Sequence, residues 1–219
     1  MTSIASRQTN ETLADLIRRL GSVPPDRIAA YPPPGSASEH DLLSPRTMDR
    51  LYELVDGVLV EKAMGYYESI LAGVLIQLLR NFLDVHPLGT VLGPDGMLRL
   101  APGLIRAPDV SFISWERFPS DEAEPKPIPD LAPDLAVEIL SVSNTIPEMD
   151  RKLREYFAAG SRLIWYVDAH LKPVRVYTSP TEYTDFAEDD TLDGAPVLPG
   201  FKLSVREWFS RAERQPSPA

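Results

Sequence analysis

The chain has 219 residues, 43% of them hydrophobic and 25% charged, which is the composition of an ordinary soluble globular protein with one sizeable core. It contains no cysteine, which excludes disulfides and thiolate metal sites and leaves oxygen and imidazole as metal-binding groups. The net charge of −10 does not favour nucleic-acid binding, but it comes from acidic stretches at 116–134 and 182–193, and the rest of the chain has no net charge.

Residues 1–46 are predicted to form an extension of the main domain. The chain opens without a secretory signal and holds no apolar stretch of about 18 residues, so we expect a cytoplasmic protein with no membrane segment. Leucine and isoleucine at helical spacing over 9–20 predict a short amphipathic helix, and the prolines that follow break regular structure. This helical and proline-rich arm precedes a main domain predicted over 47–211, followed by a polar tail over 212–219.

A tight β-hairpin is predicted at the start of the main domain, over 52–61. Its two apolar runs flank Asp56-Gly57, a residue pair typical of a two-residue hairpin turn. Apolar residues at helical spacing then predict a helix over 68–83 that is packed on most sides. Two short strands are expected next, at 90–92 and 97–100.

The second half of the main domain is predicted to contain buried strands around one helix. Apolar runs at 108–113 and 135–140 have the length and composition of such strands. The segment 120–133 between them is acidic and rich in proline, which predicts a mobile surface loop. The remaining predicted elements are a helix over 148–159 ending at Gly160, strands at 163–168, 174–177 and 201–204, and a short helix containing Trp208 and Phe209.

Two acidic residues in these strands and a lysine on the following helix form the most informative pattern. Asp109 follows a proline at the start of one run, and Glu138 interrupts the other, where an ionised carboxylate is costly unless something binds it. Phosphodiester hydrolysis needs a metal ion to polarise the phosphoryl oxygen and activate water, and Mg²⁺ prefers carboxylate oxygens. The two acids can supply ligands if their strands are neighbours, and a nearby lysine would stabilise charge on the phosphate.

Helix geometry favours Lys152 among the basic residues of the helix over 148–159. With about 100° between successive residues, the buried stripe contains Met149, Leu153, Tyr156 and Phe157. Lys152 lies just beyond Tyr156, Arg151 points to solvent, and Arg154 lies on the other flank and stays an alternative. Lys152 is therefore expected to reach a site at the sheet edge, with its aliphatic stem along apolar surface.

Several stretches of the chain resemble a known family. They are YELVDG at 52–57, APDV at 107–110, DLAVEILS at 134–141, the segment from Lys152 through Tyr156 to Gly160, and IWYVD at 164–168. Their order and spacing resemble the PD-(D/E)XK nuclease superfamily, and more closely its bacterial Uma family of restriction endonucleases, over roughly residues 50–210.

The resemblance implies an α/β (α+β) fold, with a restriction-endonuclease-like mixed β-sheet flanked by helices and an N-terminal hairpin and arm. It also implies that Asp109, Glu138 and Lys152 are catalytic and that the cofactor is Mg²⁺ or Mn²⁺. By the same analogy, the metal ligands are Asp109, Glu138 and the backbone carbonyl of Ile139, and Glu68 is an additional acidic group near the metal.

The chain departs from the family pattern at two positions. The superfamily motif has its lysine two residues after the acid, where this chain has Leu140, so the lysine role passes to Lys152 on the helix. The family often has a histidine near Tyr67, where this chain has Tyr66-Tyr67-Glu68-Ser69.

Structural roles stay open for these residues when the sequence is considered alone. Asp109 could cap a turn, and Glu138 could pair with a cation, for which Arg99, Arg106 and Lys152 are the candidates. Lys152 could pair along its helix with Glu148 or Glu155.

The remaining acids also have structural alternatives. Glu68 could be a first-turn acid favoured by the helix dipole. Glu53, Asp56 and Glu61 are expected to serve the hairpin, although Glu53 lies in a stretch that carries the resemblance.

We expect a metal-dependent endonuclease that hydrolyses phosphodiester bonds in DNA, with DNA as substrate and partner. Two alternatives stay open. One is a catalytically silent nuclease-fold binding module, and the other is a phosphodiesterase on other substrates. Homodimerisation is suggested by the resemblance alone.

Overall fold

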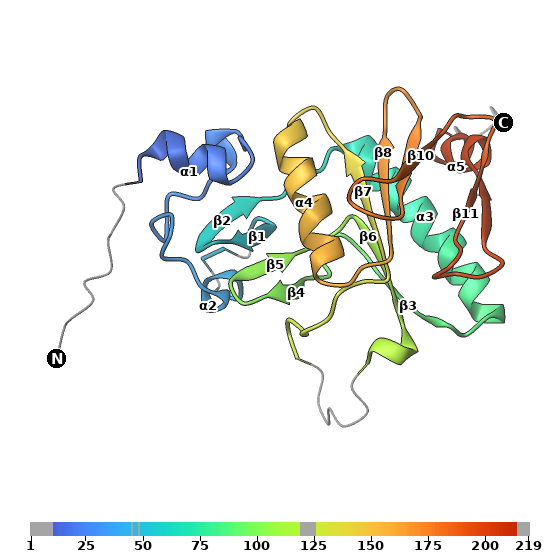
Figure 1. The fold of residues 1–219 in the computed structure, drawn as a ribbon, viewed down its shortest axis with the longest axis horizontal. Helices are drawn as coiled ribbons and strands as arrows, with labels where there is room; N and C mark the ends of the chain where they lie inside the picture. Colours follow the sequence, from blue (N-terminus) through green and yellow to red (C-terminus); the bar gives the residue numbers. More distant parts are fainter. Residues whose placement is uncertain (1–10, 45, 48, 119–125, 214–219) are drawn as a thin grey trace, which may run out of the picture.

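The computed structural model describes residues 11–44, 46–47, 49–118 and 126–213, and it contains a six-stranded and a four-stranded sheet (Figure 1). The larger sheet has the order β10-β9-β8-β7-β6-β3, and only its β7–β8 pair is parallel, so the sheet is mixed. Its strands are β3 (Gly89–Leu92), β6 (Val110–Ser114), β7 (Leu135–Leu140), β8 (Leu163–Asp168), β9 (Val174–Tyr177) and β10 (Tyr183–Phe186). The predicted fold class, a mixed sheet flanked by helices, is confirmed.

The smaller sheet has the order β2-β1-β5-β4 and is antiparallel throughout. Its strands are β1 (Tyr52–Val55), β2 (Val58–Glu61), β4 (Leu98–Ala101) and β5 (Leu104–Arg106). The other described elements are α1 (Leu13–Arg19), α2 (Glu39–Leu42), α3 (Tyr66–Val85), α4 (Ile146–Ala158), α5 (Val205–Ala212), the pair β11 (Thr191–Asp193) and β12 (Lys202–Ser204), and the 3₁₀ turns Pro25–Arg27 and Trp115–Arg117.

Helices α3 and α4 cover opposite faces of the larger sheet, because side chains alternate between the two faces of each strand. On β7, Leu135, Val137 and Ile139 belong to the largest hydrophobic cluster, which also includes residues of α3 and α5. Ala136 belongs instead to a cluster with α4. Glu138 has the same parity as Ala136, so β7 presents its one glutamate to the α4 face.

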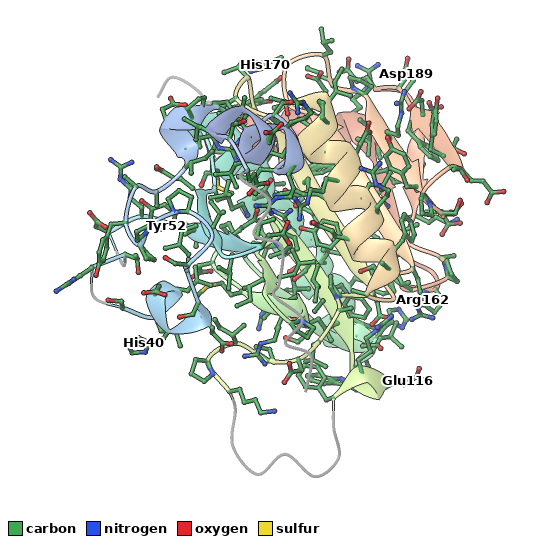
Figure 2. The ribbon with its side chains drawn as sticks, turned by 60° about the vertical axis from the view of Figure 1, so that its left-hand side comes forward. His40, Tyr52, Glu116, Arg162, His170 and Asp189 are labelled. Carbon is green, nitrogen blue, oxygen red and sulfur yellow. The ribbon has the colours of Figure 1, made fainter. Side chains whose placement is uncertain are left out.

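The predicted hairpin is present with the predicted turn. Strands β1 and β2 pair from Tyr52 with Glu61 to Val55 with Val58. Asp56 and Gly57 have φ angles of 50° and 75°, and two consecutive positive φ values are what a two-residue turn of this kind requires. Figure 2 shows Tyr52 and His40 on one side of the molecule and Arg162 and Asp189 on the other, with α4 running between them.

The N-terminal arm predicted over 1–46 packs closely on the hairpin in its described part. Helix α1 is shorter than the predicted 9–20, and 9–10 lie outside the described residues. The cluster joining arm and hairpin contains Leu16, Leu20, Val23, Val55, Val58 and Val60. Arg27 forms a buried ion pair with Glu148 of α4, with its Nη2 atom 2.8 Å from Oε1. The arm is therefore part of the packed structure, while the domain boundaries predicted at 46 and 211 stay predictions.

The prediction of a mobile surface loop over 120–133 is wrong for its second half. Residues 119–125 lie outside the described residues, but Ile128 and Leu131 are buried. Ile128 packs in a cluster with residues of β1, β2 and β5, and Leu131 packs in a cluster with residues of β4 and β6. The amide of Arg99 in β4 also donates a hydrogen bond to the carbonyl of Pro129 at 3.0 Å. Two large aliphatic side chains are enough to anchor this segment despite its acidic and proline-rich composition.

Membrane crossing demands a helix that is both long and apolar, and within the described part of the chain none meets both conditions.

Candidate functional site

Asp109 and Glu138 lie beside each other, as the sequence predicts. Strands β6 and β7 pair antiparallel with Val110 opposite Val137, so Asp109, one residue before β6, lies level with Glu138. The Oδ2 atom of Asp109 accepts a hydrogen bond of 2.6 Å from the amide of Ile139. This bond crosses from one chain segment to the next strand and fixes the carboxylate, so the turn-capping alternative does not describe Asp109.

Lys152 reaches Glu138 from α4. Its Nζ atom is 3.2 Å and 3.3 Å from the two carboxylate oxygens of Glu138 and 3.2 Å from Oε1 of Glu53. One turn further along α4, the hydroxyl of Tyr156 donates a 2.5 Å hydrogen bond to Glu138. The helical alternative for Lys152 is not what forms, because Glu148 pairs with Arg27 and Glu155 pairs with Arg106 and Arg151.

Glu53 is a full member of this cluster, which sequence reasoning missed by assigning it to the hairpin. Its Oε2 accepts a 2.7 Å hydrogen bond from Arg106 of β5, and its Oε1 accepts one of 3.1 Å from the amide of Ala107. Arg106 is held from its other side by Glu155, at 2.6 Å. The missed signal resembles that of Glu138, since Glu53 is also an acid within a run of buried apolar strand residues.

Lys62 is the second residue that the sequence did not single out. It follows β2 directly, and its Nζ lies 2.8 Å from Oδ1 of Asp109. It also donates hydrogen bonds to the carbonyls of Ala107 and of Pro94, the latter at 3.3 Å. No local pattern distinguishes this lysine from one at any hairpin end, and only the tertiary fold places it at Asp109.

We call these six residues the buried charge network: Glu53, Lys62, Arg106, Asp109, Glu138 and Lys152. Each is at most 8% exposed. Three carboxylates alternate with three cations, so charges that would be costly to bury singly are compensated within the protein.

The network shifts the pKa values of its two glutamates in opposite directions. Burial raises the pKa of Glu138, and repulsion from Asp109 and Glu53 adds to this, while Lys152 opposes it. Burial also acts against the charged form of Glu53, but Lys152, Arg106 and Lys62 outweigh it and lower the pKa to about 2. Burial opposes the charge on Lys152, yet Glu138 and Glu53 together raise its pKa, which favours the charged ammonium.

The donor set fits a hard divalent cation. Asp109 and Glu138 offer carboxylate oxygens, the donors that Mg²⁺ prefers, and Mg²⁺ is commonly bound by only one or two carboxylates together with water. The Oδ1 atom of Asp109 is buried, and the Lys62 ammonium lies 2.8 Å from it. No group of three or more His, Asp or Glu side chains suited to a metal occurs in the described ranges, so these two carboxylates would have to suffice.

Neither Ile139 nor Glu68, the two remaining predicted ligands, belongs to the buried charge network. Ile139 contributes to the site through its amide, which binds Asp109, and a ligand role for its carbonyl stays a prediction. Glu68 is buried in the first turn of α3, and its carboxylate folds back over Gly65 so closely that a Cβ there would be 2.2 Å from Oε2. The ion pairs of the described network do not include Glu68, and its role at a metal also stays a prediction.

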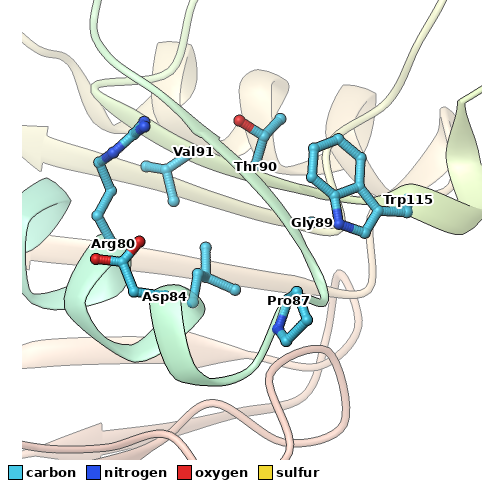
Figure 3. A pocket seen from close by; sticks show the side chains of 8 residues that line it. Arg80, Asp84, Pro87, Gly89, Thr90, Val91 and Trp115 are labelled. Atoms are coloured by element: carbon cyan, nitrogen blue, oxygen red, sulfur yellow. The ribbon is translucent and has the colours of Figure 1, made fainter.

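Two surface pockets lie outside the network. One of about 240 Å³ lies beside the exposed Trp115, between the C-terminal part of α3 and β3 (Figure 3). It is lined by Arg80, Leu83, Asp84, Pro87, Gly89, Thr90, Val91 and Trp115. Another, of about 280 Å³, is lined by residues that include Leu140, Tyr166 and Arg175. Neither pocket is lined by Asp109, Glu138 or Lys152, and the same holds for two others, of about 360 Å³ and 280 Å³.

Comparison with known proteins gives a family and a fold. The Uma2 family, described as "Putative restriction endonuclease", matches residues 38–206, which is more than half of the chain. A crystal structure described as a putative nuclease belonging to DUF820, from Anabaena variabilis, aligns with a TM-score of 0.67 at 20% identity and covers 75% of this chain and 92% of that one. At this identity the likeness shows the fold alone. No curated protein matches the chain.

Proposed function

Because the chain belongs to the Uma2 family, we propose that it is a metal-dependent endonuclease that cleaves phosphodiester bonds in DNA with Mg²⁺ or Mn²⁺. The observation that carries the proposal is the convergence of Asp109, Glu138 and Lys152 within one buried network. Phosphodiester cleavage needs such a combination, with two acids to hold a metal ion and a cation to stabilise charge on the phosphate.

Each residue has a distinct task in this proposal. Asp109 and Glu138, with the carbonyl of Ile139, would hold the dication, which would polarise the phosphoryl oxygen and lower the pKa of water. Lys152 keeps a positive charge beside Glu138 and stabilises negative charge that develops on the phosphate. Tyr156 and the amide of Ile139 orient the two carboxylates by donating a hydrogen bond to each. The carboxylate of Glu53 pairs with Lys152 and keeps it in place, and Arg106 pairs with the same carboxylate.

Cleavage assays with and without Mg²⁺ test the proposal. Plasmid, linear DNA, RNA and a chromogenic phosphodiester are incubated with the wild type and with Asp109→Asn, Glu138→Gln and Lys152→Met. We expect metal-dependent nicking of DNA that each substitution reduces by at least about 10²-fold, because each removes a ligand or the stabilising charge. Glu182→Gln, at an exposed acid, serves as the matched control and should retain wild-type activity.

Other outcomes separate the alternatives. Cleavage of the chromogenic ester or of RNA without cleavage of DNA would replace the endonuclease with a phosphodiesterase on another substrate. A specific observation favours the binding module: every carboxylate of the described network already has a cation of the chain beside it. Inactivity on all substrates with both metals, together with metal-independent DNA binding, would support that module and contradict the proposal.

A further inference from the structure

Lys62 is a buried cation that the proposed catalytic steps do not use. Its Nζ contacts Oδ1 of Asp109 at 2.8 Å and donates hydrogen bonds to the carbonyl oxygens of Ala107 and Pro94. Oxygen atoms from three residues therefore surround the ammonium in the manner in which they would surround a hard metal ion.

The two carboxylate oxygens of Asp109 have different partners. Oδ2 accepts the 2.6 Å hydrogen bond from Ile139, whereas Oδ1 lies 2.8 Å from the Lys62 ammonium. A dication that binds Oδ1 would lie close to this ammonium. A dication and the Lys62 ammonium would repel each other strongly if both were in contact with Oδ1.

We infer that Lys62 is a positioning residue that occupies the cation position at Asp109 and has to leave Oδ1 before a divalent metal can bind there. This inference rests on the proposed metal-dependent function. Lys62 keeps Asp109 compensated while the metal is absent, and its flexible four-carbon stem allows the ammonium to withdraw. Lys152 lies beside Glu138 as well, but at 3.2 Å and 3.3 Å it is farther from the carboxylate oxygens than Lys62 is from Oδ1 of Asp109, at 2.8 Å.

Binding of Mn²⁺ alone, measured by titration calorimetry, tests this role. Lys62→Gln and Lys62→Met remove the charge, and we expect them to bind Mn²⁺ at least about tenfold more tightly than the wild type, because the competing cation is gone. Lys62→Arg keeps the charge and should stay within about threefold of the wild type. The unfolding temperature of Lys62→Gln without metal should fall, and Mn²⁺ should raise it by more than it raises that of the wild type.

The sign of the change separates this role from a purely structural one. A lysine that only supported the site would weaken metal binding when replaced, so weaker or unchanged binding by both neutral variants overturns the inference. Equal tightening by Lys62→Arg and Lys62→Gln overturns it too, because charge would then not be the cause. Lys202→Gln, at an exposed lysine that pairs with Asp193, is the matched control and should bind like the wild type.

The proposed function and this inference can fail separately. Wild-type binding that Asp109→Asn abolishes and Lys62→Gln leaves unchanged would keep the metal site and remove only the role of Lys62. Absence of binding by the wild type and by every Lys62 variant would remove the metal site and the inference with it.

Discussion

Glu53 and Glu138 are two glutamates of one charge network, and the network treats them differently. Glu53 lies among Lys152, Arg106 and Lys62, and its pKa falls to about 2. Burial raises the pKa of Glu138, and repulsion from Asp109 and Glu53 adds to the rise, while Lys152 opposes it. Of the two glutamates, Glu138, whose pKa is raised, is thus the one proposed to bind a metal together with Asp109. Glu53 provides the negative charge that holds the cations in place.

Replacing Glu53 with glutamine is expected to destabilise the protein at neutral pH by roughly 3–5 kcal/mol, because buried Arg106 and Lys152 lose a counter-charge. The folded-state pKa of about 2 lies below the ordinary 4.5, so the contribution of Glu53 is fully present above pH 4.5 and is lost as the pH falls towards 2. Urea unfolding at several pH values should show the wild type losing on the order of 3 kcal/mol over this range from Glu53, and a flatter acid limb for Glu53→Gln.

Glu61→Gln is the control on the same hairpin. Glu61 is partly exposed and pairs with the exposed Arg50, so its replacement should cost less than about 1 kcal/mol. Equal losses for Glu53→Gln and Glu61→Gln would contradict a special contribution from the buried network.

Elements with strong local signals could be predicted, and those defined by tertiary contacts could not. The hairpin, α3, α4, β7 and β8 were predicted within two residues at each end, because apolar period, turn residues and helix stops agree there. Strands β5, β10 and β11 and helix α2 were not predicted. Strand β5 has three residues and β10 is mostly exposed, so neither carries an apolar pattern, and pairing with a neighbour defines each one.

The candidate site divides in the same way. The sequence predicts Asp109, Glu138 and Lys152 because one acid begins a strand signal, the other interrupts one, and the lysine lies at a calculable angle on a helix. Lys62 and Arg106 carry no such signal, since each is an ordinary basic residue at the end of a short strand, and only the docking of the smaller sheet brings them to the acids.

The contact between the arm and α4 gives a prediction at the scale of elements. Gly21 has a φ of +89°, and a Cβ there would be 2.6 Å from the Cα of Glu148. Gly21→Ala should therefore cost about 1–2 kcal/mol for its backbone conformation and a further 1–3 kcal/mol for the clash at the start of α4. Chemical unfolding of the variant measures the sum.

Gly35→Ala isolates the clash. Gly35 has a nearly identical φ of +92°, but a Cβ there would meet nothing within 4 Å. The Gly35 variant should show only the backbone cost, and an equal loss for both variants would mean that the arm does not press on α4.

At the scale of the whole molecule, the arm completes a structure that the family match only partly covers. The match begins at residue 38, yet Leu16, Leu20 and Val23 bury hairpin valines and Arg27 neutralises Glu148. The arm predicted from proline content as an appendage is thus a structural support for the helix that carries Lys152. Homodimerisation stays a prediction.

Removal of residues 1–37 is expected to destabilise the protein strongly, because it exposes Val55, Val58 and Val60 and removes Arg27, the ion-pair partner of Glu148. Glu148→Gln should then have different effects in the two backgrounds. It should destabilise the full chain by about 3–5 kcal/mol and cost much less in the shortened one, where the ion pair is already absent. Unfolding curves of the four proteins test this, and an equal loss of stability in both backgrounds would exclude the proposed pairing.

The buried charge network has a consequence for how the protein acquires its site during folding. Its six residues come from six places: β1, the end of β2, β5, the start of β6, β7 and α4. No segment shorter than 53–152 holds them all, so excised peptides or a half-assembled intermediate would carry isolated charges without their counter-ions. Burying an unpaired charge is costly, and long stretches of chain must close into loops before the acids and the cations of the network can pair. The proposed activity should accordingly appear in an all-or-none fashion, together with the cooperative folding of the whole domain.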